Sequence, residues 1–167
     1  MKKAMTETDF TKLWQRVSAQ FRCGPESIHG PSHWKRVEKN GLLLATKTGA
    51  DITVVRLFAL FHDSCRENDF EDEGHGERGA ALAASWRGEL FEVTDATFQP
   101  LHEACAGHTD GHQHADPTIG TCWDADRLDL GRIGVLPDED FMSTGFGKEI
   151  ARTGSVYPFL RQDGETR

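Results

Sequence analysis

The sequence lacks the cysteine and histidine motifs that define several large classes of protein. Its 167 residues include four cysteines but no C-x-x-C pair, no dense cysteine framework and no H-E-x-x-H motif. Zinc fingers, zincins and disulfide-stapled scaffolds are therefore disfavoured. No apolar segment approaches the length of a membrane span, and none follows the N-terminus as a signal-peptide core would. These absences predict a cytoplasmic protein with reduced thiols and no membrane partner.

An excess of positive charge is also absent. The 19 Lys and Arg are outnumbered by 27 Asp and Glu, so the net charge is 19 − 27 = −8 at pH 7. A chain this acidic has no general footprint for a nucleic-acid backbone, and none is expected as a partner. Any phosphate group it handles must be met by local cations or a metal ion. The sequence sets no oligomeric state.

Alternation of apolar and polar residues with a period of two is nearly absent, whereas apolar residues recur at helical spacing. The length suits one domain. We predict an all-α fold, a compact single-domain helical bundle over residues 1–167, with a core at about 28–134 and a helical C-terminal extension at 135–167. Helices are expected at about residues 7–22, 32–48, 52–62, 77–90, 97–108 and 118–130.

Histidine is the residue type whose distribution points to chemistry. All eight histidines lie between His29 and His114, and several have Asp or Glu beside them. Imidazole and carboxylate together suit a divalent ion such as Mn, Fe, Co, Ni, Zn or Mg, whereas calcium prefers oxygen ligands alone. The sequence thus predicts a divalent metal cofactor, with the identity of the ion and the number of ions left open.

Separate segments offer the ligands. His33 opens a predicted helix in "HGPSHWKRV", and His62 and Asp63 end an apolar helix in "LFALFHD". A further helix carries Asp124 and Asp126 in "CWDADRLDLG", and one of these acids can serve the metal while the other holds a ligand histidine or caps a neighbour. A buried carboxylate is costly unless it is paired or metal-bound, so convergence of these helices on one metal ion would explain acids beside apolar residues.

The order His33, then His62-Asp63, then Asp126 resembles the HD superfamily of metal-dependent phosphohydrolases. The settings "HWKRV", "LFALFHD" and "DADRLDLG" are family-like, and the resemblance covers roughly residues 28–134. It implies an all-helical fold in which these four side chains bind one divalent metal. In the family pattern the acid directly before Arg-Leu is the ligand, which selects Asp126. The Gly-Tyr-Pro signature of the cyclic-dinucleotide branch is absent, so that substrate is disfavoured.

The resemblance extends to residues around the expected metal. Extended family members carry further histidines that bind a second metal or phosphate, and His75 in "GHGERGA" and His108 in "CAGHTDG" are at similar positions. Many members also place an acid four residues after the histidine of the doublet. Here that position holds Arg66, and Glu67 follows it. The identity of the general base is therefore left open between Asp63, which could orient the water, and Glu67.

The implied activity is hydrolysis of a phosphate ester or anhydride in a small phosphorylated metabolite, with a nucleotide as the first choice. Metal-activated water would attack phosphorus, and Arg66, Arg78 and Arg127 would supply local positive charge. Two alternatives stay open, a diiron-type oxygenase on the same fold and a non-catalytic sensor module that binds a metal or ligand. Histidines expected to be structural or solvated are His29, His102, His112 and His114.

Overall fold

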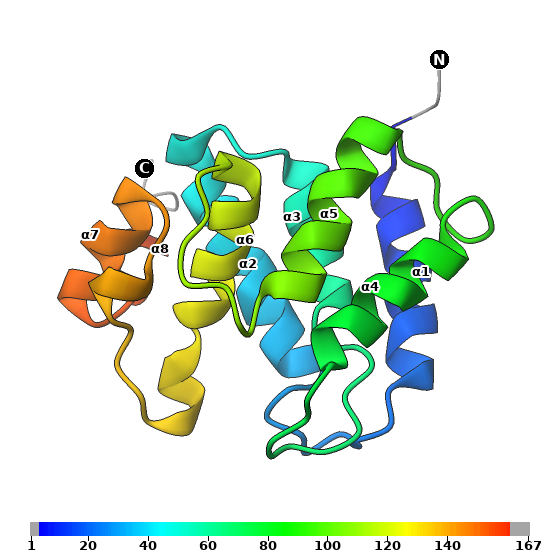
Figure 1. Cartoon of the computed structure of the whole chain (residues 1–167), viewed down its shortest axis with the longest axis horizontal. Helices are drawn as coiled ribbons and strands as arrows, with labels where there is room; N and C mark the ends of the chain where they lie inside the picture. The colour runs from blue at the N-terminus through cyan, green and yellow to red at the C-terminus, as the bar shows by residue number, and fades with distance from the viewer. Residues whose placement is uncertain (1–3, 161–167) are drawn as a thin grey trace, which may run out of the picture.

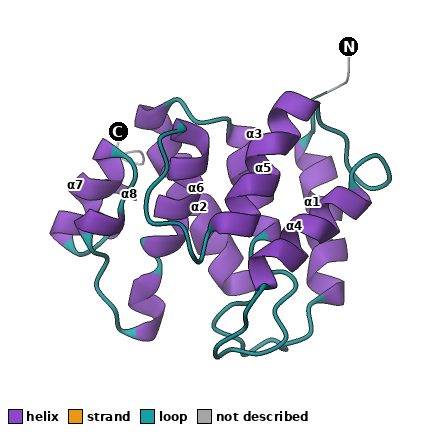
Figure 2. Cartoon of the chain, viewed as in Figure 1, coloured by secondary structure: helices purple, strands orange, loops and turns teal. Residues whose placement is uncertain are grey.

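The computed structural model describes residues 4–160, which form helices and connecting loops without a strand (Figures 1 and 2). The α-helices are α1 (Glu7–Gln20), α2 (Pro31–Thr48), α3 (Ile52–Phe61), α4 (His75–Trp86), α5 (Asp95–Gly107), α6 (Pro117–Arg127), α7 (Gly145–Thr153) and α8 (Tyr157–Leu160). Two 3-10 turns, η1 (Leu130–Ile133) and η2 (Glu139–Phe141), lie between α6 and α7. The end of the predicted C-terminal extension, residues 161–167, lies outside the described residues.

Helix starts follow the capping residues that the sequence displays. The Asp51 side chain accepts hydrogen bonds from the backbone N–H groups of Thr53 and Val54, and Thr94 caps α5 in the same manner. The largest boundary differences are at α4 and α6. The first of these begins two residues earlier than predicted and ends at Trp86, because Arg87 is extended and Gly88 has a φ of +86°. Helix α6 ends at Arg127, and η1 follows.

The core is built around α3. Its residues from Val54 to Phe61, apart from Arg56, are almost fully buried. Helix α2 packs against both α3 and α6, while α4 packs against α5, as Figure 1 shows. Because α3 is apolar on nearly all sides, with Arg56 as the charged exception, burial places its C-terminal end, with His62 and Asp63, inside the molecule. Among residues 4–160, none of the helices combines the length and the apolar composition of a membrane span.

Small residues let α4 approach the C-terminal end of α3 closely. A Cβ atom on Gly79 would lie 2.3 Å from the carbonyl oxygen of Phe61 and 3.1 Å from that of His62. A Cβ atom on Gly76 would lie 2.5 Å from the carbonyl oxygen of Cys105. These neighbours are backbone atoms that cannot rotate away. The glycines therefore hold the start of α4 directly against the ends of α3 and α5.

We expect Gly79→Ala to destabilise the protein by about 2–3 kcal/mol, since overpacking against backbone forces elements apart. Thermal and urea unfolding followed by circular dichroism would measure the change. Gly145→Ala is the matched control, because Gly145 opens α7 and has nothing within 4 Å of an added Cβ. A Gly79→Ala variant as stable as this control would contradict the close approach.

Candidate metal centre

The predicted ligands come from helix ends that meet at one place, at the lower centre of Figure 1. The third residue of α2 is His33, and the first residue of α4 is His75. His62 and His108 are the C-cap residues of α3 and α5. Asp63 follows His62, and Asp126 lies at the end of α6. Segments far apart in sequence therefore contribute to a single cluster of imidazoles and carboxylates.

One group of ligand atoms comprises the quartet that the sequence predicted. The Nε2 atoms of His33 and His62 are 3.1 Å apart, and Asp63 Oδ2 lies 3.5 Å from each. Asp126 Oδ1 lies 3.1 Å from His33 Nε2 and 3.7 Å from His62 Nε2. His33 and His62 have no solvent exposure, and Asp63 is 2% exposed. The geometry thus converges the four side chains on one small buried volume.

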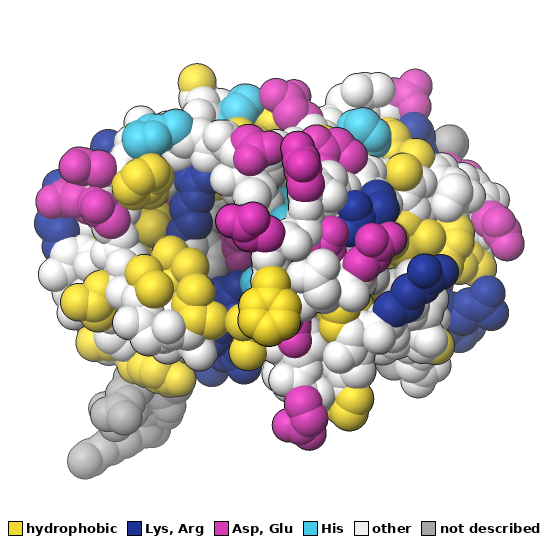
Figure 3. Space-filling view, turned by 60° about the horizontal axis from the view of Figure 1, so that its bottom comes forward, with side chains coloured by type: hydrophobic (Ala, Val, Ile, Leu, Met, Phe, Trp, Pro, Cys, Tyr) yellow, Lys and Arg dark blue, Asp and Glu magenta, His cyan; other side chains and the backbone are white. Residues whose placement is uncertain are grey.

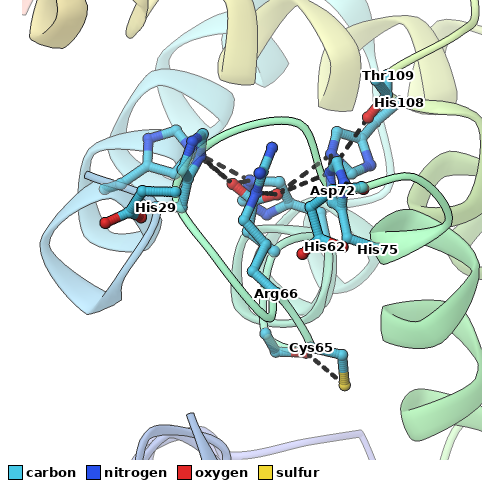
Figure 4. Close-up of polar contacts among 12 residues, drawn as sticks. His29, His62, Cys65, Arg66, Asp72, His75, His108 and Thr109 are labelled. Atoms are coloured by element: carbon cyan, nitrogen blue, oxygen red, sulfur yellow. Dashed lines mark hydrogen bonds and ion pairs between the residues drawn. The ribbon is translucent and has the colours of Figure 1, made fainter. Parts of the chain in front are cut away.

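A second group lies on the other side of Asp63. The Nε2 atoms of His75 and His108 are 3.0 Å apart, and Asp63 Oδ1 lies 3.2 Å and 3.4 Å from them. All three residues are buried. Figure 4 shows His75 and His108 together on one side and His29 on the opposite side, with interactions meeting between them. Asp63 therefore offers one carboxylate oxygen to each group.

The protonation pattern of these imidazoles fits metal ligation. His62 Nδ1 lies 3.0 Å from the carbonyl oxygen of Phe58 and 3.1 Å from that of Ala59. A carbonyl oxygen only accepts, so Nδ1 carries the proton and Nε2 turns a lone pair toward the centre. The Nδ1 atoms of His33, His75 and His108 likewise donate to Asp129 Oδ2, the Asp72 carbonyl and the Cys105 carbonyl, respectively, so Nε2 is the ring atom that faces the centre.

The Nε2 atoms that face each other require a proton or a metal ion between them. Within each group two imidazole Nε2 atoms lie about 3 Å apart beside at least one carboxylate oxygen. Acceptors buried at such distances repel one another unless a proton or a metal ion lies between them. Both groups, His33–His62–Asp63 and Asp63–His75–His108, have ligand atoms within 4.8 Å of one another. The donor set therefore fits one or two divalent ions. Its imidazole and carboxylate ligands suit the same ions that the sequence predicted.

Asp129 supports the first group and was not singled out from the sequence. Its Oδ2 atom accepts from His33 Nδ1 at 2.7 Å, and its carboxylate also accepts from Arg36 Nε at 2.8 Å. Burial lowers the pKa of His33, but hydrogen bonds to Asp126, Asp129 and Asp63 outweigh it and raise that pKa to about 10. The available signal was its position three residues after Asp126, since residues three apart share a face in the helix predicted over 118–130.

We expect metal binding to release at least one proton per chain near pH 7. With a pKa of about 10, His33 is protonated in the metal-free protein at that pH, and a metal can bind only the deprotonated Nε2. Apparent metal affinity should therefore rise as pH increases toward 10, by about tenfold per pH unit for one released proton. Calorimetric titration in two buffers of different ionisation enthalpy measures this release. Identical heats in both buffers would contradict it.

His29 also belongs to the cluster, although the sequence indicated a structural role. The Nδ1 atom of His29 lies 3.1 Å from Asp63 Oδ2, and His29 is 9% exposed. Arg132 NH2 approaches the same Nδ1 atom at 3.4 Å. A carboxylate only accepts, so His29 donates to Asp63 and fixes the orientation of the shared carboxylate. Its spacing of four residues before His33 was the signal for this position.

Arg66 is beside the centre, as the sequence suggested. Its Nε atom donates to Asp63 Oδ1 at 3.2 Å, and its NH1 atom donates to the Phe70 carbonyl at 3.1 Å. Figure 4 shows its side chain rising toward the cluster. The Glu67 side chain is exposed, and its backbone N–H donates to Asp72. No contact places the Glu67 carboxylate at the centre among the described residues, so its role as a base stays a prediction.

Arg127 is engaged elsewhere. It donates to the carbonyl oxygens of His112 and Phe141 at 2.6 and 2.7 Å and to that of Gly111. Its guanidinium holds the loop after α5 in place, and a role toward phosphate stays a prediction.

Asp124 accepts from the backbone N–H groups of Ser143 and Thr144, so of the two acids on α6 it is Asp124 that fixes a neighbouring segment.

The remaining predicted contributors lie around the loops. Arg78 donates to Asp72 Oδ1 and to the Cys65 carbonyl, which fixes the loop before α4. Thr109, which was not singled out from the sequence, has its Oγ1 atom 3.2 Å from His75 Nε2. In Figure 3 the face that carries these loops is hollowed near its middle, and histidine atoms are visible inside the hollow. The four cysteines are free.

The backbone of this chain is similar to that of a predicted HD superfamily hydrolase from an uncultured Thermotogales bacterium. The TM-score is 0.67, and the 22% identical alignment covers 95% of each chain. Neither a protein-family model nor a curated protein sequence matches the chain. The likeness confirms the all-α, HD-type fold predicted from the sequence. Fold and site together define an HD-type helical protein with buried His and Asp groups that could hold a metal ion.

Proposed function

We propose that this protein is a metal-dependent phosphohydrolase whose substrate is a small phosphorylated metabolite, with a nucleotide as the first choice. The observation that carries the proposal is the pair of ligand groups that share the two oxygens of Asp63. The HD superfamily resemblance and the hydrolase name of the structural neighbour support the reaction class. The substrate choice rests on the family resemblance alone.

The residues present divide the chemistry between them. A divalent metal, when bound, supplies a nucleophilic water near neutral pH and polarises a phosphoryl oxygen. His33, His62, Asp63 and Asp126 would hold it, and His75 and His108 would hold a second ion with Asp63. His29 and Arg66 both donate to Asp63, and these two hydrogen bonds hold the shared carboxylate in one orientation.

Arg66 is the cation best placed to meet a substrate phosphate. Its Nε and NH1 atoms are occupied by Asp63 and by loop carbonyls, and its NH2 atom has no hydrogen-bond partner within residues 4–160. A guanidinium fixed at one edge and open at the other suits a phosphate oxygen. The arginine thus stands where the family usually has an acid, and its positive charge favours binding of an anionic substrate over activation of water.

The second pair of histidines also favours an alternative, a diiron-type oxygenase. His75 and His108 complete a second ligand group that a mononuclear hydrolase does not need. Two imidazole-and-carboxylate groups joined by one carboxylate suit iron as well as Mn or Co. Metal content and oxygen consumption separate the two functions. A sensor module without catalysis would keep the metal and show neither activity.

The deciding experiment combines metal analysis with an activity screen. The protein is purified without chelators, its metals are measured, and phosphate release from a panel of nucleotides and simpler monoesters is followed with added Mn, Ni, Co or Mg. Release that depends on added metal and disappears with chelator is the expected result. If no ion supports phosphate release and the iron-loaded protein consumes oxygen, the oxygenase function is correct and the hydrolase function is wrong.

A further inference from the structure

A cavity separate from the metal centre lies between α2, the segment after η1, and α8. Its volume is about 510 Å³, within the range of small-molecule sites. None of the predicted metal ligands lines it. The residues that define its chemistry are the cations Arg36, Lys39 and Arg132 and the apolar or aromatic side chains Val135, Leu136 and Tyr157. Asp129 lies in its wall as well.

The charge around this cavity opposes that of the whole chain. Three cationic side chains and one carboxylate line it, in a protein whose net charge is −8. Lys39 is exposed and makes no ion pair with the described part of the chain. Arg36 uses only Nε to bind Asp129, which leaves its terminal nitrogens without a partner among residues 4–160. These free donors lie three residues apart on one α-helix, so they share one face of it and can contact the same ligand.

The opposite wall of the cavity suits an apolar body. Tyr157, Leu136 and Val135 are 66%, 76% and 46% exposed, although each is large and apolar or aromatic. Exposed apolar side chains beside unpaired cations are typical of a binding site for a ligand that has an anionic part and an apolar part. The wall beside Tyr157 can accept a planar ring, because aromatic faces stack with one another.

We infer that this cavity binds a small organic phosphate monoester, with the dianionic head on Lys39 and Arg36 and an apolar or aromatic body against Tyr157 and Leu136. Phosphate is favoured because guanidinium and ammonium donors converge there with a net positive charge. This binding site is additional to the metal centre and goes beyond the proposed hydrolysis.

Occupancy of the cavity is coupled to the metal centre through Asp129. Arg36 donates to the same carboxylate that accepts from His33 Nδ1 at 2.7 Å. A phosphate that draws Arg36 toward itself leaves more of the Asp129 charge to His33, which strengthens that imidazole as a ligand. The metal affinity should therefore increase when the cavity is filled. Because linkage is reciprocal, metal binding should tighten the phosphate by the same factor.

The first test uses the fact that Tyr157 is the single tyrosine of the chain. Metal-free protein labelled with 3-fluorotyrosine gives one fluorine resonance, which is followed during titration with phenylphosphonate, a stable mimic of a phosphate monoester. We expect a saturable shift, with phenylphosphonate binding about tenfold more tightly than inorganic phosphate because its ring is buried. No saturable shift would overturn the site.

Variants of two lysines on α2 make the test specific. Lys39→Glu should weaken phenylphosphonate binding at least about tenfold, because it replaces an attractive charge with a repulsive one. Lys35→Glu is the matched control, since Lys35 is also exposed on α2 but its ammonium lies 5.8 Å from the Trp14 ring, outside the cavity. Equal binding by both variants would show that the anion binds elsewhere and would overturn the assignment.

Coupling is tested with Mn²⁺, whose free concentration is measured by electron paramagnetic resonance. Saturating phenylphosphonate should raise the Mn²⁺ affinity of the wild-type protein by about fivefold, the lower end of typical coupling. In Lys39→Glu the effect should disappear, which corrects for Mn²⁺ that the phosphonate binds in solution. An equal effect in both proteins would overturn the coupling through Asp129. Neither measurement depends on hydrolytic activity, so both stand if the proposed reaction fails.

Discussion

Asp63→Asn is expected to remove bound metal from both ligand groups and to lower phosphate release by about 10³-fold. The lost stabilisation is several kcal/mol, and each 1.36 kcal/mol is tenfold in rate. The size of the effect follows from the position of the carboxylate, which gives Oδ2 to His33 and His62 and Oδ1 to His75 and His108. One substitution thus weakens every metal-binding group that the described residues form.

Metal content by elemental analysis and turnover in the activity screen measure this effect. Asparagine has nearly the same shape as aspartate, so the helical circular dichroism spectrum should be retained. Asp110→Asn is the matched control, because Asp110 is exposed on the loop after α5. An Asp63→Asn protein with its full metal content and normal turnover would disprove the assignment of Asp63 as the shared ligand.

His75→Ala is expected to reduce the metal content from two ions per chain to one and to lower turnover by about 10²-fold, the loss typical of removing one charge-stabilising group. The first ion should stay, because His75 meets Asp63 Oδ1, whereas His33 and His62 lie against Oδ2. His108→Ala should give the same result. Combining both substitutions should add little, since residues of one ligand group act as a unit.

Solvent-facing His102 provides the control for this series. It lies on α5, the helix that ends at His108, and its replacement by alanine should change neither metal content nor turnover. If wild-type protein loaded with Mn²⁺ or iron contains only one ion, the two groups do not bind metal at the same time. A His75→Ala variant that still contained two ions would equally exclude that group as a metal site.

Much of the fold was predictable because the pattern of apolar residues and caps is local. The apolar run from Val54 to Phe61 predicts a buried helix, and Asp51 marks its start. The doublet His62-Asp63 at the end of that run, with His33 and Asp126 in family-like settings, also indicated the quartet that the structure brings together. The reliable signals were thus chemical groups attached to strongly periodic segments.

The supports of the ligands could not be predicted in the same way. Asp129 and His29 act through contacts with residues 96 and 34 positions away in the chain, and such contacts depend on how helices pack. Arg127 shows that spacing does not give the partners of a cation either, because its guanidinium donates to loop carbonyls that the sequence did not indicate, while its role toward phosphate stays a prediction. Sequence spacing gives the face of a helix but not the neighbour that faces it.

The meeting of helix ends at the centre has an electrostatic consequence of its own. Helices α3, α5 and α6 finish there, and their C-terminal ends carry partial negative charge from aligned peptide dipoles, which favours bound cations. Helices α2 and α4 begin there, and their N-terminal ends carry partial positive charge. The interaction of a charged group with each helix end contributes about 0.3–1 kcal/mol. The backbone itself therefore adds partial charges of both signs around the centre, which favour a bound cation beside the helix C-termini and a negatively charged group beside the N-termini.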